Sequence, residues 1–488
     1  MKTGLLTSVS LLGLLALGGP ARAATEGGVP PTTYTGGGGD PTAWSDPGNW
    51  DNGVPAARQT LNFVGTTGQF LVYDDPNHPA YGSVIIESSD GAPGGIQTFT
   101  WLQQNNPGGF SASSLILGRT AGQGGTYWVN NPGATLTSAQ TVVGGAGYAF
   151  LVQNAGNSSL GRLTVGQLPG SVGTVGLVVG TMADDAIVGD AGSGAFNNTG
   201  GTHNVTGNLI LGNQATGVGT YTINGAASQT NVAFVPGGNG LANPPGSNGL
   251  ARDSNNVVTG NNPNANGALI VGEAGTGTVA QGLANLSDPG NAVTVAGDLV
   301  LGHQTGSQGT YTLNTGALTV GGKMVIGGAS QNNNQFIQHG GSVAITGANG
   351  GNPDYVGVGN SNGANSLLIG GGGGDLDNGT GTYTMHGGTL TTSLIDIGHS
   401  GVGTFTQHGG TVNASFAIWL GNCGGCNTGN SSGTYNLSGG TINAAGEQVG
   451  LFGHGLLNQS GGVNSTARAC SRRPITPAFT STAVWRSG

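Results

Sequence analysis

Apolar and polar residues alternate over short runs along most of this chain. The segment 381–390 reads Gly-Thr-Tyr-Thr-Met-His-Gly-Gly-Thr-Leu, with apolar side chains at every second position of its first half and Thr between them. A period of two is typical of a β-strand with one buried face, whereas a helix needs apolar residues at i, i+3 and i+4. The helical spacing does not recur in these segments, so the pattern predicts an all-β fold.

The alternating segment is an internal repeat. Its central aromatic or Leu position recurs at Tyr383, Phe405, Tyr435 and Leu457, at intervals of 22, 30 and 22 residues. A second element, a short apolar run closed by Gly, alternates with the first, and we therefore expect two strands per repeat. This second element occurs at Leu115–Gly118, Leu209–Gly212, Leu269–Gly272, Leu299–Gly302, Met324–Gly327, Leu367–Gly370 and Ile418–Gly421.

Stacking of these repeats gives each of them a buried face. One coil of this length cannot cover its own apolar side, but stacked coils bury it as one continuous column. Gly-Gly between strands permits the positive φ that a sharp corner requires. We predict a right-handed parallel β-helix, or β-solenoid, over residues 111–466. A β-propeller is the alternative, although its blades need four strands and ~40 residues.

The region that precedes the repeats, residues 24–110, differs from them. It contains Trp44, Trp50 and Trp101 and no clean copy of the repeat. The first coil of a solenoid would otherwise expose an open strand edge, so we expect a distinct capping region here.

Charged residues are unusually rare. They make up 6% of the chain, against about 25% in an average globular protein, while 102 of the 488 residues are Gly. Disordered chains are usually charged and poor in β-branched residues, which this chain is not. The net charge is -9 and basic residues are scattered. Nucleic-acid binding needs clustered Lys and Arg, so this composition excludes it as a function.

The first 23 residues have the organisation of a secretory signal peptide. Lys2 provides the positive start, Leu5–Leu17 the apolar stretch, and Ala21–Ala23 a small-x-small cleavage site. The apolar stretch is too short for a stable transmembrane helix, and no later segment is long and apolar enough. We expect export and no transmembrane helix.

Three cysteines are present. Cys423 and Cys426 lie in a Gly- and Asn-rich segment, and Cys470 lies near the end of the chain. In an exported protein a local disulfide between Cys423 and Cys426 is the favoured outcome, and a redox or zinc site would need partners that the sequence does not contain.

Two constellations suggest a metal ion. His339, His386 and His408 occupy the same repeat position and are expected to form a column, which could bind a metal. However, Ser438 and Ser460 hold this position later, so an outward polar corner is the favoured interpretation. The segment 371–378 resembles a calcium-binding Gly/Asp turn, but such turns bind calcium in tandem and this one occurs once. We predict no metal and no cofactor.

Catalysis is disfavoured by the same kind of reasoning. Polysaccharide lyases and hydrolases on β-helices need paired carboxylates or a cation at a groove. We expect Asp184 and Asp185 to lie in a loop without a nearby Arg or Lys, and Lys323 and Arg252 to be isolated. We therefore predict no catalytic residue, with a polysaccharide-active β-helix enzyme as the alternative.

A binding role is better supported. Trp419 stands between Ile418 and Leu420, and alternation directs its indole outward when the two neighbours face inward. An exposed aromatic ring on a neutral Thr- and Asn-rich surface suits contact with carbohydrate or protein. The alternative is that Trp419 packs beneath a neighbouring loop.

The segment 42–55, with its Trp, Asn-Trp and Gly-Val-Pro pattern, resembles the start of many bacterial autotransporter-like passengers. The repeats resemble those of type V secretion passengers and PEP-CTERM-associated proteins. This resemblance covers residues 40–466 and implies a β-helical surface or secreted protein of a Gram-negative bacterium. Residues 467–488 depart from both families. They form an atypical basic tail, for which a frameshifted or truncated reading frame is the favoured explanation.

Together these features lead to one functional hypothesis. We expect an exported cell-surface or extracellular protein that acts in adhesion or as matrix, through contacts with extracellular polysaccharide or a surface protein. A purely structural spacer is a third alternative. The oligomeric state is not predicted.

Overall fold

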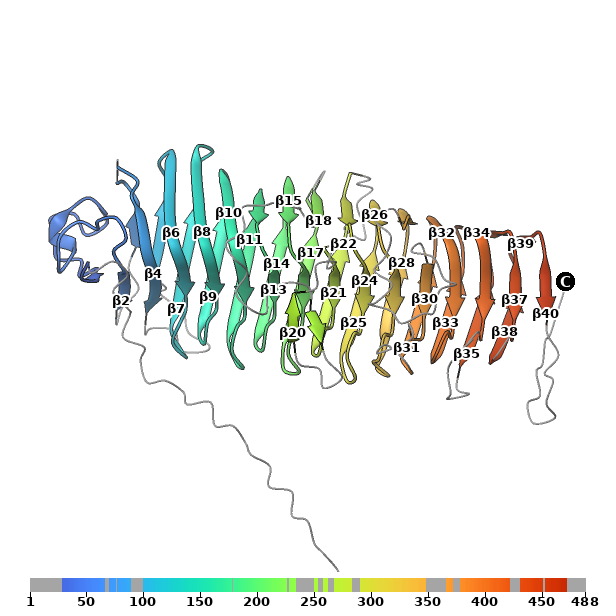
Figure 1. Ribbon diagram of the computed structural model, residues 1–488. Coiled ribbons are helices and arrows are strands. Elements are labelled where there is room, and N and C mark those ends of the chain that lie inside the picture. Colours follow the sequence, from blue (N-terminus) through green and yellow to red (C-terminus); the bar gives the residue numbers. More distant parts are fainter. Residues whose placement is uncertain are drawn as a thin grey trace, which may run out of the picture.

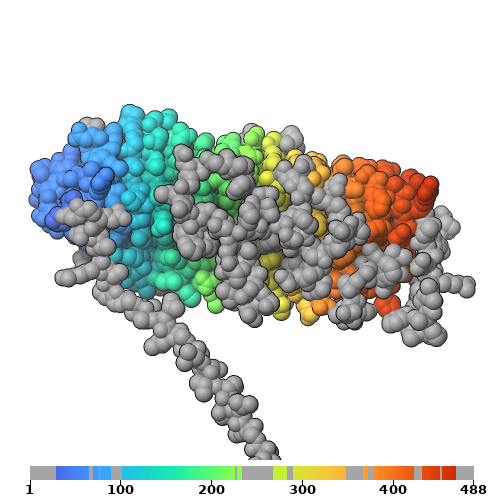
Figure 2. Space-filling view, in the orientation of Figure 1, coloured from blue at the N-terminus to red at the C-terminus, as the bar shows by residue number. Residues whose placement is uncertain are grey.

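The protein is an elongated rod in which the strands run across the long axis (Figure 1; Figure 2). The aromatic-rich N-terminal part forms one end, and the strands follow one another along the rod in chain order (Figure 1). No helix among the described residues is long and apolar enough to cross a membrane. This computed structural model describes residues 29–65, 70–75, 77–88, 100–177, 179–225, 228–233, 250–252, 258–261, 267–282, 290–347, 366–371, 378–421, 431–450 and 453–471.

The all-β, parallel β-solenoid prediction is confirmed. Within the described residues, 38 strands join one sheet, and the pairing is almost entirely parallel, between equivalent strands of successive coils. Most coils contain three short strands, so the rod has three faces, which we name A, B and C. The exceptions among the described residues are two single antiparallel bridges, Ser88–Gly124 and Tyr34–Trp50, and a separate antiparallel pair, β19 (Leu250–Arg252) and β20 (Val258–Asn261).

Face A carries the Gly-Thr-Tyr-Thr-Leu segments. Its strands are β3 (Phe70–Val72), β5 (Thr100–Gln104), β7 (Gly124–Val129), β9 (Tyr148–Gln153), β11 (Val172–Leu177), β14 (Ser193–Asn198), β17 (Val218–Ile223), β22 (Thr276–Gln281), β25 (Gln308–Leu313), β28 (Asn334–Gln338), β31 (Thr380–Met385), β33 (Val402–Gln407), β35 (Ser432–Leu437) and β38 (His454–Gln459).

Faces B and C follow in each coil. Face B consists of β12 (Gly180–Met182), β15 (Thr202–Val205), β18 (Gln229–Val232), β23 (Ala292–Val295), β26 (Ala317–Val320), β29 (Ser342–Ile345), β36 (Thr441–Ala444) and β39 (Val463–Thr466). Face C consists of β1 (Thr32–Thr33), β2 (Leu61–Gly65), β13 (Ala186–Val188), β16 (Leu209–Leu211), β21 (Leu269–Val271), β24 (Leu299–Leu301), β27 (Met324–Ile326), β30 (Ser366–Ile369), β37 (Glu447–Val449) and β40 (Ala469–Ser471). The long strands β4 (Ala80–Ser88), β6 (Gly108–Leu117), β8 (Ala134–Val143), β10 (Asn157–Val165), β32 (Thr389–Ile397) and β34 (Thr411–Leu420) pair with strands of both faces.

The expectation of two strands per repeat was wrong, because the segment after Gly-Gly forms a strand of its own. The second Gly of the pair turns the corner from face A to face B, with φ +83° at Gly388 and +77° at Gly410. A Cβ atom at Gly388 would lie 2.2 Å from the carbonyl oxygen of Gly341 in the preceding coil. Only Gly fits this corner, since it combines a positive φ with contact between backbones.

The core of the repeats is a column of aromatic rings behind face A. Tyr383, Phe405 and Tyr435 are fully buried, and their ring centroids are 4.6 and 4.7 Å apart in nearly parallel planes. A Gln in the preceding coil accepts the buried tyrosine hydroxyl: Tyr383 Oη lies 2.6 Å from Gln338 Oε1, and Tyr435 Oη lies 2.7 Å from Gln407 Oε1. The core therefore keeps its polar atoms hydrogen-bonded from one coil to the next.

The N-terminal end is built differently. Trp44, Trp50, Tyr73, Tyr81 and neighbouring rings form a buried aromatic cluster, and Trp50 Nε1 donates to the carbonyl of Trp44 at 2.9 Å. The short 3-10 helix η2 (Pro47–Asn49) leads into Trp50. Parallel pairing already begins here, because β1, β2 and β4 pair in turn before β6. At the other end, β40 continues the ladder to Ser471.

Several sequence predictions lie outside the described residues. They are the signal peptide (1–23), the Cys423–Cys426 disulfide, the Gly/Asp turn around Asp375, and most of the basic tail (467–488), of which the structure describes only residues up to 471.

Candidate functional site

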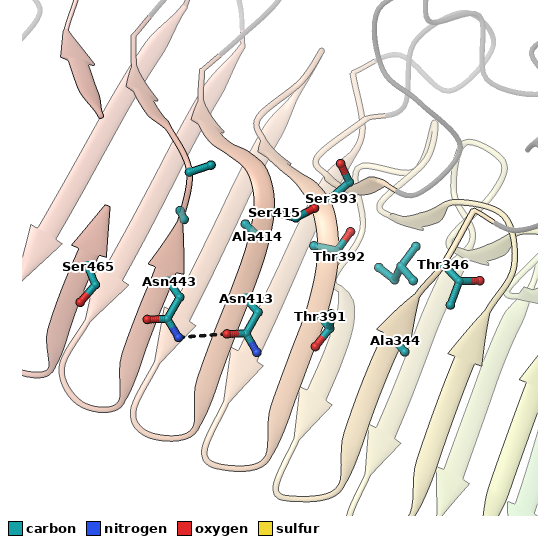
Figure 3. A pocket seen from close by; sticks show the side chains of 13 residues that line it. Ala344, Thr346, Thr391, Thr392, Ser393, Asn413, Ala414, Ser415, Asn443 and Ser465 are labelled. Carbon is teal, nitrogen blue, oxygen red and sulfur yellow. Dashed lines mark hydrogen bonds between the residues drawn. The ribbon is translucent and has the colours of Figure 1, made fainter. Parts of the chain in front are cut away.

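A shallow groove of about 570 Å³ crosses five coils near the C-terminal end of the described rod (Figure 3). It follows the outward side of face B and the adjoining corner, from β29 to β39. The side chains that line it are those of Ala344, Ile345, Thr346, Thr391, Thr392, Ser393, Asn413, Ala414, Ser415, Asn443, Ala444, Ala445 and Ser465.

The repeat places one polar or small side chain per coil in the groove. Strand register aligns Ala344, Thr391, Asn413, Asn443 and Ser465 in a single column. Asn443 Nδ2 donates to Asn413 Oδ1 at 2.9 Å, which leaves Asn413 Nδ2 and Asn443 Oδ1 pointing away from this bond (Figure 3). The column therefore offers both a donor and an acceptor to a ligand lying along the rod.

None of the residues that line the groove is charged. Ala and Ile side chains supply apolar contacts, and Thr, Ser and Asn supply neutral hydrogen-bonding groups. Because neighbouring strands are ~4.8 Å apart, these groups repeat at that interval along the axis. The groove is thus suited to an extended, uncharged ligand that itself has a short repeat.

Trp419 lies on β34, just beyond the corner of the groove. Ile418 and Leu420 are fully buried, while Trp419 is half-buried and stands in register with Asp396 and Gln448. Phe416, which was not predicted as a contact residue, is 56% exposed. Its ring packs edge to face against that of Trp419, with 5.9 Å between the ring centroids. The sequence contains no signal for this exposure, because alternation from Val412 and Ala414 would direct Phe416 inward, whereas β34 breaks the alternation at two successive exposed residues, Ser415 and Phe416.

His339, His386 and His408 do form a column at the corner after face A. Their rings stack at 4.9 and 5.1 Å, and His408 Nδ1 lies 3.0 Å from Ser438 Oγ. Partial desolvation and the neighbouring imidazoles lower the pKa of His386. Face-to-face rings do not direct their nitrogens toward one ion, and the described residues contain no group of three or more His, Cys, Asp or Glu side chains arranged to hold a metal.

The prediction that Asp184 and Asp185 have no cation near them was wrong. Arg162 Nη2 lies 3.7 Å from Asp184 Oδ2, because the two residues occupy neighbouring coils. Burial raises the pKa of Asp185 to about 7. Its carboxylate accepts the backbone N–H of Asn208 at 2.7 Å, which joins one coil to the next.

Lys323 is not isolated either. Asp298, which is buried and has a raised pKa, accepts the backbone N–H of Lys323 at 2.6 Å. Burial in turn lowers the pKa of Lys323. Because Asp298 repeats the contact of Asp185 at the same kind of corner, we interpret both carboxylates as links between coils rather than catalytic groups.

Further close contacts join acidic side chains to Arg or His side chains. Glu87 and Arg119 are 2.7 Å apart, as are Glu273 and His303. Within one coil, Asp396 Oδ2 lies 2.8 Å from His399 Nδ1. The acidic partner is fully buried in all three pairs, which fixes the corners next to the strands.

Comparisons with known proteins give no relative to guide the interpretation. No family model matches the chain, and neither a curated protein nor a solved structure matches it. The functional proposal therefore rests on the groove and its surroundings.

Proposed function

We propose that this protein is an exported β-solenoid of the bacterial surface or extracellular matrix, which acts in adhesion by binding neutral polysaccharide along the groove from β29 to β39. The observation that carries this proposal is the uncharged column of Thr391, Asn413, Asn443 and Ser465. The likeness of the repeats to secreted passengers and PEP-CTERM-associated proteins supports the extracellular setting.

The chemistry of the groove matches that of a sugar chain. A polysaccharide presents hydroxyl groups at regular intervals, and each can donate to Asn413 or Asn443 or accept from them. Phe416 and Trp419 lie next to this corner and offer apolar ring faces to pyranose rings. Each contact is weak, but several coils engaging one chain add their contributions through effective concentration.

The test is binding of neutral polysaccharides to the full chain, measured by affinity electrophoresis in gels containing β-glucan, mannan, galactan or xylan. We expect retardation in at least one of these gels. The double substitution Asn413→Ala/Asn443→Ala should weaken binding about thirtyfold, since each of two lost hydrogen bonds contributes about 1 kcal/mol.

A matched control lies on the same face. Asn231 Nδ2 donates to Asn204 Oδ1 at 2.9 Å in two coils that do not contribute to the groove. Asn204→Ala/Asn231→Ala should leave binding unchanged. Equal weakening by both pairs, or retardation in none of the gels, would overturn the proposal. Release of reducing ends or unsaturated sugars would favour the enzyme alternative instead.

A further inference from the structure

Face A carries a regular array of threonines on its outward side. Strands β17, β25, β31 and β33 each contain Thr, an inward aromatic residue and Thr, while β22 and β35 carry one Thr of the two. Strand β28, between β25 and β31, carries Gln335 and Ile337 at these positions, so the threonines form two groups, one on β17 to β25 and one on β31 to β35. We name these outward side chains the Thr array. They are all partly exposed, because each Thr packs against the equivalent side chain of the next coil.

The array is flat and in register. Thr382 pairs with Thr404 and Thr384 pairs with Thr406, without a bulge between the strands. Directly behind them, Tyr383 and Phe405 stack at 4.6 Å with only 6° between their planes. The stacked rings support neighbouring strands at the same height. The hydroxyl groups are therefore spaced by ~4.8 Å between coils and by ~6.7 Å along a strand.

The spacing between coils is close to a spacing found in hydrogen-bonded water. Two oxygens bonded to one tetrahedral water at ~2.75 Å are about 4.5 Å apart, close to the distance between coils. One water can therefore bridge Thr382 and Thr404, and a row of waters can follow the column. Each Thr also exposes a methyl group, beside which water keeps its hydrogen bonds to other waters.

The remaining outward side chains of face A add no charge to this surface. The outward positions from β17 to β35 carry no charged side chain among the described residues, whereas a charge would bind and reorient its own waters. Face B has fewer threonines at its equivalent positions, where Thr alternates with Ala, Asn, Gln and Ser. Thr is favoured in any strand for its shape, so the distinguishing features are the two-dimensional spacing and the flat support.

We propose that the Thr array is an ice-binding surface, whose partner is the ordered water lattice of an ice crystal. This role is independent of the polysaccharide groove, which lies on face B. The array would hold the rod against ice by aligning waters that are already close to their positions in the crystal.

The test is ice adsorption by the full chain, measured as its enrichment in slowly grown ice and as inhibition of ice recrystallisation. We expect enrichment and smaller ice crystals than with bovine albumin at the same concentration. Thr382→Lys/Thr404→Lys should abolish both effects, because two charges at the centre of the array disrupt the bridging waters. Thr382→Val/Thr404→Val removes only the hydroxyls, keeps the side-chain shape, and should reduce both effects.

The matched control is Thr294→Lys/Thr319→Lys, a pair in register between neighbouring coils on face B. It should leave ice adsorption unchanged. Exclusion of the native chain from ice, or equal loss in the face A and face B variants, would overturn the proposal. Polysaccharide binding measured on the same samples keeps the two proposals separate, since the face A variants should retain it.

Discussion

The aromatic cluster at the N-terminal end and the aromatic column of the repeats both bury aromatic rings, but they pack these rings in different geometries. In the column, Phe405 meets one ring on each side, those of Tyr383 and Tyr435, in planes 6° and 13° from its own. In the cluster, one indole meets five rings within 6.0 Å at angles from 38° to 86°. These contacts join Trp44 to Trp50, Phe63, Tyr73, Tyr81 and Phe110.

This difference in packing indicates how many residues share the stabilising burial in each region. A column spreads burial over many equivalent positions, and each coil depends mainly on its neighbours. A cluster concentrates burial in a few side chains that share their contacts. Damage to the cluster should therefore be local and severe, whereas damage to the column should be smaller at any one coil.

The largest effect is expected for Trp44→Ala. This ring is fully buried, and its removal should cost about 3–5 kcal/mol of local stability. Hydrogen exchange should show lost protection in β2 to β6 and unchanged protection in β31 to β35. Phe405→Ala, the matched truncation in the column, should cost less, and its lost protection should be confined to the neighbouring coils. Uniform loss of protection along the whole rod would contradict the comparison.

The next effect depends on pH. His203 is fully buried, stacks on Phe196 and lies 3.1 Å from the carbonyl oxygen of Leu177. Desolvation lowers its pKa to about 4, whereas the unfolded chain binds this proton near pH 6.5. Protons then favour the unfolded chain, and stability falls by roughly 3 kcal/mol as the pH drops from about 7 to about 4.

Comparison of variants isolates this effect. Asp185 has the opposite slope, since its raised pKa means that the folded state takes up a proton first as the pH falls. We expect the stability of the native chain relative to His203→Gln to fall by roughly 3 kcal/mol between pH 7 and pH 4 in denaturant titrations. The exposed His386→Ser should leave most of the loss in place. Parallel pH profiles for native chain and His203→Gln would refute the assignment.

A smaller effect on stability is expected for the buried polar atoms of the aromatic column. Gln407→Leu removes the acceptor of the Tyr435 hydroxyl and the donor to the Gly410 carbonyl. Buried groups left unsatisfied should cost about 2 kcal/mol. Adding Tyr435→Phe should recover part of this loss, because the hydroxyl is then gone. A double-mutant cycle on urea midpoints measures the coupling, and strictly additive costs would show that the pair does not interact.

The smallest effect on stability is expected at the groove. Asn413→Ala removes one partly exposed amide and should change the free energy of unfolding by less than about 0.5 kcal/mol. The thermal midpoint of this variant should match that of Asn204→Ala. A large drop specific to Asn413 would mean that the groove column supports the coil rather than a ligand.

The sequence was informative where a property repeats. The alternation around Tyr383 and the Gly-Gly corners predicted the stacked coils, because each coil has the same chemistry. It was less informative at Phe416 and the groove, which depend on how outward positions of different coils align. The pair of Arg162 and Asp184 shows why nearness was misjudged: the two residues are 22 residues apart, the length of one coil. In a solenoid, residues separated by the length of one coil lie side by side, as do residues that are adjacent in the sequence.

The parallel ladder also determines how the rod bears a load. Hydrogen bonds between coils point along the long axis, so tension applied between the two ends acts on them in series. The end coil should detach first, and each coil of 22 to 30 residues that detaches releases roughly 70–100 Å of extended chain. A cell held to a surface by such a rod would have a tether that lengthens in steps under flow and dissipates the pull before the grip at its far end is lost.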